Sequence, residues 1–130
     1  MRTKENSRLM VYMMIGLPAS GKSTYAKKTY VNYPIVSRDL CNGSKKKEQA
    51  QLEGLLSDGV SVVVDDTNYC VKNRAEIILI AKKYGAEVIG TYVKVDKETA
   101  LERNSKREKK VPASAIHLLY SKFEEPRKEE

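Results

Sequence analysis

One short segment constrains the fold of this chain more than any other: a glycine, four residues and then Gly-Lys-Ser, running from Gly16 to Ser23. It follows an apolar run, Leu9 to Ile15, which has the length and composition of a strand covered on both faces. From Lys22 to about Tyr33, apolar side chains recur at a helical spacing. A strand, a glycine-bounded loop and a helix in this order predict the first unit of a parallel α/β sheet.

Each fixed residue of this loop meets a physical demand of phosphate binding. The glycines allow backbone conformations that turn several N–H groups onto phosphate oxygens, and the following helix points its positive end at the same anion. Lys22 reaches the β and γ phosphates of a nucleoside triphosphate, and Ser23 offers a hydroxyl to Mg²⁺. We therefore expect ATP and Mg²⁺ as cofactors. The residues expected to bind the nucleotide are Gly16, Pro18, Ala19, Ser20, Gly21, Lys22, Ser23 and Thr24.

The rest of the chain alternates β-rich apolar runs with helix-like segments, which is typical of βαβ units. Further strands are expected at 34–37, 60–65 and 87–95, and further helices at 73–84, 96–107 and after residue 112. The polar, Lys-rich stretch 41–51 is expected to be a loop that leads into a helix ending before Gly59. The sequence thus predicts an α/β protein with the P-loop NTPase fold, in which helices flank a central parallel sheet of about four strands.

Length and composition favour a single P-loop domain over 1–130, with flexible ends at 1–8 and 125–130. The N-terminus is too polar for a secretory signal, and the run from Leu9 to Ile15 is too short to cross a bilayer. Cys41 and Cys70 lie far apart without a metal-type spacing, as expected for reduced thiols in the cytoplasm. A formal net charge of +7 favours an anionic partner, but charge alone does not choose between polyphosphates and nucleic acid.

Acidic residues follow two of the predicted strands. Asp39 lies just past the second strand, so it projects at the carboxyl edge of the sheet, on the same rim as the loop. A carboxylate there can take the proton of an acceptor hydroxyl in phosphoryl transfer, although Asp also commonly caps helices and forms turns. Asp65 and Asp66 end the third strand, where an acid can bind a substrate group, hold Mg²⁺ through water or form a turn with Thr67 and Asn68.

Basic residues gather near the end of the predicted helix 96–107. Arg103 and Arg107 are four residues apart and share one face, with several lysines around them. Such a run is commonly a solvated surface. Here it lies between a helix and Pro112, where small kinases carry an arginine-bearing lid over the triphosphate.

With these residues in hand, the sequence resembles the kinase domains of the 5′-hydroxyl polynucleotide kinase family, best known from phage RNA-repair enzymes. The resemblance covers most of residues 10 to 125 and rests on four blocks: Gly16 to Thr24, Ser37-Arg38-Asp39, Val62 to Asn68, and Arg103-Asn104-Ser105-Lys106-Arg107 followed by Val111-Pro112. It implies transfer of the γ-phosphate of ATP to the 5′-hydroxyl of single-stranded or end-exposed DNA or RNA.

The resemblance also implies roles for individual residues. Asp39 is the expected general base, Lys22 the catalytic phosphate ligand and Arg107 the lid arginine, with Arg103 beside the nucleotide. The residues expected to bind the acceptor are Arg38, Asp66 and Asn68. This chain departs from the family in two ways: Asn42 stands where the family usually has an arginine that grips the acceptor's phosphate, and the segment 42–59 is shorter.

Two other functions fit the same residues. One is a kinase of the same fold that acts on a small molecule or nucleoside. The other is a module that binds ATP without transferring its phosphate, because the acceptor channel is incomplete. A polymeric acceptor is expected to lose affinity steeply as the salt concentration rises, whereas a neutral small acceptor is not.

Overall fold

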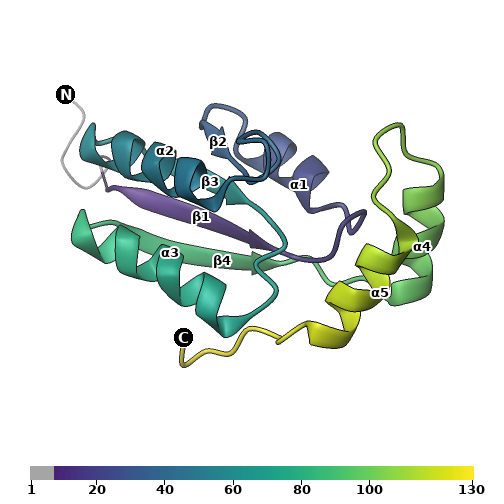
Figure 1. Ribbon diagram of the computed structural model, residues 1–130. Coiled ribbons are helices and arrows are strands. Elements are labelled where there is room, and N and C mark those ends of the chain that lie inside the picture. The colour runs from purple at the N-terminus through teal and green to yellow at the C-terminus, as the bar shows by residue number, and fades with distance from the viewer. Residues whose placement is uncertain (1–7) are drawn as a thin grey trace.

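The computed structural model describes residues 8–130, which form a four-stranded parallel sheet with helices on both faces (Figure 1). The strands are β1 (Met10–Ile15), β2 (Ile35–Val36), β3 (Val62–Asp65) and β4 (Glu87–Tyr92), and their order in the sheet is β2-β3-β1-β4. The predicted α/β class and parallel sheet are therefore confirmed. The sequence predicts flexibility at residues 1–8. Residues 1–7 of this range lie outside the described part of the chain.

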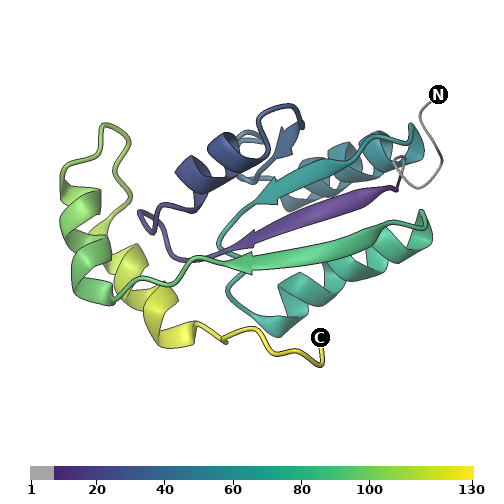
Figure 2. The same cartoon turned by 180° about the vertical axis from the view of Figure 1, so that it is seen from behind.

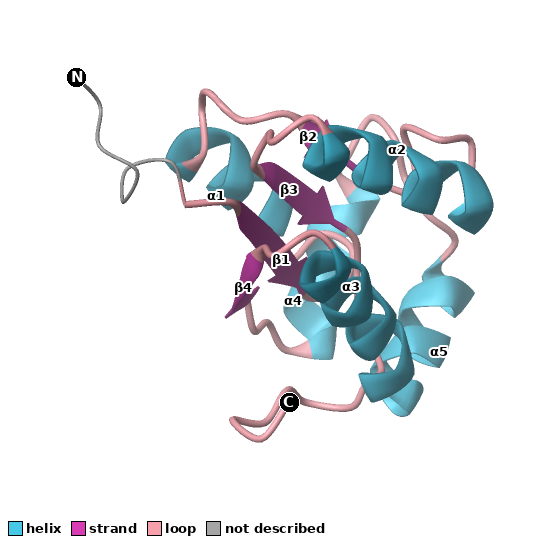
Figure 3. Cartoon of the chain, turned by 90° about the vertical axis from the view of Figure 1, so that its left-hand side faces the viewer, coloured by secondary structure: helices cyan, strands magenta, loops and turns pink. Residues whose placement is uncertain are grey.

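Five helices are found among the described residues: α1 (Lys22–Thr29), α2 (Lys45–Ser57), α3 (Val71–Lys83), α4 (Lys97–Ser105) and α5 (Ala113–Lys122). The edge-on view of Figure 3 shows α2 and α3 on one face of the sheet and α1 on the other. The view from behind in Figure 2 shows α4 and α5 beyond the ends of β1 and β4, where the arrows point. Among residues 8–130, no helix is both long and apolar enough to cross a membrane.

The strand β1 is buried on both faces, which explains why its sequence is a continuous apolar run. Towards α2 and α3, Val11, Met13 and Ile15 join the largest apolar cluster. Towards α1, Met14 packs with Ala26. A third cluster joins three elements that are far apart in the sequence, through Leu17 of the loop, Ala100 of α4 and Ile116 of α5. The pair α4 and α5 is therefore anchored directly on the loop that follows β1.

Three predicted boundaries need correction. The helix expected to reach Tyr33 ends at Thr29, and Tyr30 beyond it stacks on Tyr12 with ring centroids 4.3 Å apart. The helix expected to begin after residue 51 begins at Lys45, because the Ser44 hydroxyl caps it by accepting a hydrogen bond from the Lys47 amide at 3.1 Å. The fourth strand ends at Tyr92 rather than at residue 95.

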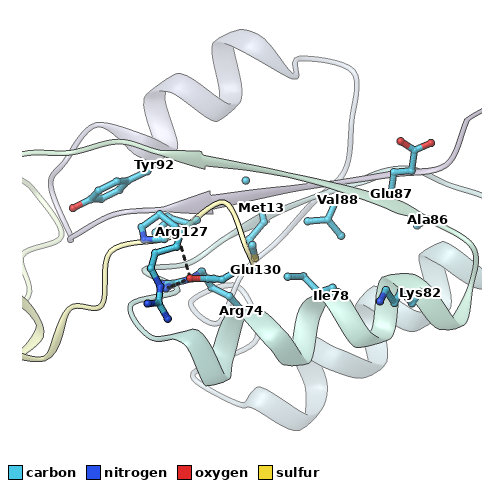
Figure 4. Close-up of a pocket in the computed structure, with 13 residues that line it drawn as sticks. Met13, Arg74, Ile78, Lys82, Ala86, Glu87, Val88, Tyr92, Arg127 and Glu130 are labelled. Carbon is cyan, nitrogen blue, oxygen red and sulfur yellow. Dashed lines mark hydrogen bonds and ion pairs between the residues drawn. The ribbon is translucent and has the colours of Figure 1, made fainter.

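The C-terminal tail, for which the sequence predicts flexibility from residue 125, has defined contacts in the structure. It borders a cavity of about 500 Å³ between α3 and β4. Figure 4 shows Glu130 turned towards Arg74 of α3, whose Nε and Nη2 donate to the two carboxylate oxygens at 2.7 and 3.0 Å. The Arg74 side chain is fully buried, so the tail supplies the counter-charge that this guanidinium requires.

Candidate active site

The loop between β1 and α1 has the geometry that its sequence predicts. Ala19 and Gly21 both have left-handed backbone conformations, with φ of 65° and 98°. Such conformations turn successive amides towards one side, which creates a concave surface for an anion. Gly21 directly precedes α1, and no acidic residue occupies the first turn of that helix. The positive end of α1 therefore faces the concave side of the loop without a competing carboxylate.

The backbone around Gly16 leaves no room for a side chain. A Cβ atom on this residue would lie 2.8 Å from the carbonyl oxygen of Val93 and 2.9 Å from the Ser20 hydroxyl. Its amide donates to the Thr67 carbonyl at 3.0 Å, which ties the start of the loop to the end of β3. Gly16 does not line the cleft described next, and its contact with the nucleotide stays a prediction.

A cleft of about 940 Å³ opens at the carboxyl edge of the sheet and brings the remaining predicted residues together. Its lining includes every predicted site residue except Gly16: Pro18, Ala19, Ser20, Gly21, Lys22, Ser23, Thr24, Arg38, Asp39, Asp66, Asn68, Arg103 and Arg107. Two further lysines of the predicted basic run, Lys109 and Lys110, also line it. The cleft is thus basic where α4 and the loop meet and acidic where β2 and β3 end.

Lys22 is the charged centre of this cleft. Burial lowers the pKa of its ammonium group, whereas the carboxylates of Asp65 and Asp66 act in the opposite direction. The charge of Arg107 is close enough to lower the pKa of Lys22 further. A partly desolvated ammonium beside a guanidinium gains stability from an incoming anion, so this part of the cleft suits a polyphosphate.

Ser23 and Asp65 form a pair that the sequence did not predict. The Ser23 hydroxyl donates to Asp65 Oδ2 at 2.6 Å. The register of the sheet explains the contact, because Met14 of β1 lies beside Asp65 of β3, so this acid ends next to the loop. The available signal was an acid at the end of a predicted strand. The other oxygen, Asp65 Oδ1, is buried and has no hydrogen-bond partner among the described residues.

The acidic side of the cleft is organised around Arg38. Its amide donates to Asp66 Oδ1 at 2.7 Å, and its side-chain Nε donates to Glu48 Oε1 at 2.9 Å. Asp39 is exposed in the turn that follows β2 and lines the cleft beside Arg38. Burial, together with the neighbouring Glu48 carboxyl, raises the pKa of Asp66 to about 7. Sequence reasoning missed Glu48, because it placed this residue in a polar loop rather than on a helix that packs against β2 and β3.

Two predicted residues support the loop through their side chains. The Asn68 amide is buried and donates to the Met14 carbonyl at 2.7 Å, so its nitrogen is already used within the protein. Arg103 Nη1 donates to the Ser20 carbonyl at 3.2 Å and thereby links α4 to the loop. Arg107 is exposed after the end of α4 and lines the cleft.

The strand, the loop with Gly-Lys-Ser and the helix that follows it define a P-loop domain with the predicted P-loop NTPase fold. The chain belongs to the AAA domain family, whose family model matches residues 11–126. This range includes every residue of the candidate site.

Two curated relatives have names that include a kinase. The L-seryl-tRNA(Sec) kinase of Methanococcus maripaludis is 29% identical, in an alignment that covers 90% of this chain and 53% of the relative. The bifunctional polynucleotide phosphatase/kinase of Schizosaccharomyces pombe is 29% identical, in an alignment that covers 98% of this chain and 33% of the relative. The second relative confirms the resemblance to polynucleotide kinases. The chain spans about half the length of the first relative and a third of the second.

A solved structure confirms the fold. One chain in a structure of the Pnkp1/Rnl/Hen1 RNA repair complex superposes with a TM-score of 0.75 and 23% sequence identity. The match covers 93% of this chain and 46% of that chain. The fold described above is therefore shared with that chain.

Proposed function

We propose that this chain transfers the γ-phosphate of ATP to the 5′-hydroxyl of DNA or RNA. One observation above all supports the proposal: Lys22 of the loop, Asp39 past β2 and Arg107 past α4 line a single cleft. Phosphoryl transfer needs cations around the moving phosphoryl group and a carboxylate beside the acceptor hydroxyl, and both are available in this cleft.

On the donor side, the loop amides and Lys22 bind the β and γ phosphates. Ser23 is suited to Mg²⁺ because its hydroxyl proton is directed to Asp65, which leaves the oxygen lone pairs free for a cation. One protein oxygen with phosphate oxygens and waters is a common ligand set for this ion. When bound, Mg²⁺ neutralises part of the phosphate charge. Arg103 holds the loop through the Ser20 carbonyl.

On the acceptor side, Asp39 accepts the proton of the acceptor hydroxyl while that oxygen forms a bond to the γ-phosphorus. The bond between the γ-phosphorus and the oxygen bridging to the β-phosphate breaks, and ADP leaves. Arg107 balances the negative charge on the transferring group. Arg38 and Asp66 shape the acceptor pocket beside Asp39. Asn68 lines the same cleft and is fixed by its hydrogen bond to the Met14 carbonyl of β1.

A nucleic acid acceptor is supported by the names of two relatives, which act on a polynucleotide or on a tRNA. The net charge of +7 agrees with a polyanionic partner. Exposed lysines suited to a nucleic acid strand are Lys27 and Lys28 on α1 and Lys46 and Lys47 on α2. Lys45 is less suited, because its Nζ pairs with Glu76 at 2.6 Å.

The direct test is label transfer from γ-labelled ATP, with Mg²⁺, to DNA and RNA oligonucleotides that carry a 5′-hydroxyl. Asp39→Asn is expected to lower kcat by about 10²- to 10⁴-fold while the Kd for ATP stays nearly unchanged, because the base contacts only the acceptor. Arg107→Ala is expected to lower kcat as well, since it removes charge stabilisation from the transition state. Undiminished transfer by Asp39→Asn would refute the assignment of the base.

A second set of acceptors distinguishes the remaining candidate functions. Seryl-tRNA is the first of these, because the match to the L-seryl-tRNA(Sec) kinase covers 90% of this chain. A nucleoside and a sugar represent small neutral acceptors, whose KM is expected to be insensitive to salt, unlike that of an oligonucleotide. ATP binding without transfer to any acceptor would instead indicate a binding module.

A further inference from the structure

The wall segment, residues 66–69, follows β3 and lines one side of the cleft without forming a helix or a strand. Within it, Asn68 has a φ of 46°, which is an uncommon backbone conformation for a residue other than glycine. A segment outside any helix or sheet keeps such a conformation only when its surroundings hold it there. The place of the wall segment in the cleft therefore depends on contacts with other parts of the chain.

Three successive carbonyl groups of the wall segment accept a hydrogen bond from elsewhere in the protein. The first, at Thr67, accepts from an amide of the loop after β1 at 3.0 Å. The second, at Asn68, accepts from Arg74 Nη1 at 2.7 Å. The third, at Tyr69, accepts from the amide of Glu124 at 2.7 Å. This third contact ties the wall segment to the part of the chain that follows α5.

Glu124 also caps the helix that follows the wall segment. Its Oε1 accepts a hydrogen bond from the amide of Val71, the first residue of α3, at 2.7 Å. Cys70, at the N-cap position, gives the helix no side-chain hydrogen bond within residues 8–130, and the first turn contains no acid. The Glu124 carboxylate therefore supplies the acceptor and the negative charge that a helix commonly obtains from its own first residues. Asn73 in this first turn lines the cleft.

The segment 123–130 is itself anchored at both ends. Phe123 stacks on Tyr92 of β4, with ring centroids 5.4 Å apart, and packs against two of the apolar clusters. At the other end, Glu130 pairs with the buried Arg74, as Figure 4 shows. Because Arg74 holds the second carbonyl of the wall segment, two of the three carbonyl contacts depend on the segment 123–130.

We infer that Glu124 is a positioning residue, which fixes the wall segment and the first turn of α3 in the place that the acceptor requires. The inference rests on the proposed function and extends its machinery to the chain after α5. Glu124 is not among the described residues that line the cleft, so it acts through the wall segment and not by touching a substrate. Its hydrogen bonds go to the wall segment and to α3, not to the loop that binds the phosphates.

The test compares Glu124→Ala with Glu124→Gln, using γ-labelled ATP and an oligonucleotide that carries a 5′-hydroxyl. Glu124→Ala is expected to raise KM for the oligonucleotide about 5- to 10-fold, because the wall segment then spends less time in the binding position. The Kd for ATP is expected to stay within about twofold of the wild type. Glu124→Gln is expected to keep both values within about twofold, because its side-chain oxygen can still accept from the Val71 amide.

Glu125→Ala is the matched control in the same segment. Glu125 contacts Tyr92 at 3.4 Å and Lys94 at 3.2 Å and makes no hydrogen bond to the wall segment among the described residues. Its loss is therefore expected to leave KM for the oligonucleotide unchanged. A merely structural role for Glu124 predicts less active protein, and hence a lower kcat with an unchanged KM. That result, or a Glu124→Gln protein with the KM of Glu124→Ala, overturns the inference.

Two readouts that need no catalysis separate this inference from the proposed function. The first is hydrogen exchange of the Val71 amide, which is expected to be about tenfold faster in Glu124→Ala than in the wild type or in Glu124→Gln. Equal exchange rates overturn the inference, whether or not the protein transfers phosphate. The second is equilibrium binding of the oligonucleotide in the presence of a non-hydrolysable ATP analogue. Wild-type protein that binds no oligonucleotide overturns both proposals, and binding that Glu124→Ala leaves intact overturns this one alone.

Discussion

The side chain of Asn104 and the main chain of Val111 exchange two hydrogen bonds: Nδ2 donates to the Val111 carbonyl at 2.7 Å, and the Val111 amide donates to Oδ1 at 3.0 Å. Asn104 is only 5% exposed, at the end of α4. The pair closes the segment between α4 and α5, which carries Arg107 to the cleft. The buried Asn104 side chain thereby anchors the exposed basic segment.

Asn104→Ala removes both hydrogen bonds and leaves the Val111 amide and carbonyl without their partner. We expect a loss of about 1–3 kcal/mol in the free energy of unfolding. If the proposed function is correct, transfer is expected to slow by about 10- to 100-fold, because the segment that carries Arg107 is no longer fixed at the cleft. Urea unfolding and steady-state kinetics measure the two effects. Ser105→Ala is the neighbouring control, since its exposed hydroxyl donates to the Glu102 carbonyl of the same helix. Equal kinetics for both variants would contradict the assignment.

Gly16→Ala tests whether this glycine is required by sterics. The added Cβ would meet the Val93 carbonyl at 2.8 Å, and a backbone atom cannot move aside easily. We expect destabilisation of about 1–3 kcal/mol, measured by urea unfolding. Gly54→Ala in α2 is the control: nothing lies within 4 Å of its Cβ position, and a gain of about 0.5–1 kcal/mol is expected. A stable Gly16→Ala protein that fails to bind ATP would instead favour direct nucleotide contact.

The residues whose roles follow from local rules were predictable from the sequence. The glycines, Lys22 and Ser23 occur in a fixed spacing, and an apolar run before them defines the strand. Asp39 and Asp66 follow strands, so a parallel sheet brings them to the same rim. Thus thirteen of the residues that line the cleft could be predicted without coordinates.

The partners of these residues could not be predicted in the same way. Glu48 reaches Arg38 only because α2 begins at Lys45, and that start depends on a single capping hydroxyl within a Lys-rich stretch. The contact of Ser23 with Asp65 depends on the register of β1 against β3. Such contacts between distant residues arise from tertiary packing, for which a single sequence carries no periodic signal.

Asp66→Asn tests the raised pKa of Asp66. The charged neighbours of this carboxyl group are Arg38, Glu48 of α2 and Lys22 of α1. Burial first, and then Glu48, raises this pKa from 3.8 to about 7. The folded protein therefore holds the proton more tightly than the unfolded chain. Wild-type stability is expected to fall, relative to Asp66→Asn, as the pH rises from about 4 to about 7, by up to about 1.4 kcal/mol per pH unit, and to change no further above pH 7.

Urea unfolding of both proteins from pH 4 to pH 8 measures this difference. Taking the difference cancels the titration of groups that both proteins share. Parallel curves over this range would show that Asp66 ionises in the folded protein as it does in the unfolded chain.

The contact between Arg74 and Glu130 couples the tail to the rim of the cleft. Arg74 is fully buried, and its Nη1 donates to the Asn68 carbonyl at 2.7 Å while Glu130 binds its other side. Glu130→Ala leaves a buried guanidinium without its counter-charge, and we expect a loss of about 3 kcal/mol in the free energy of unfolding. In a protein that already carries Arg74→Met, the same change is expected to cost under about 1 kcal/mol, because no charge remains to be balanced. Urea unfolding of the four proteins gives the coupling energy. Losses that simply add would mean that the tail does not stabilise Arg74 in solution.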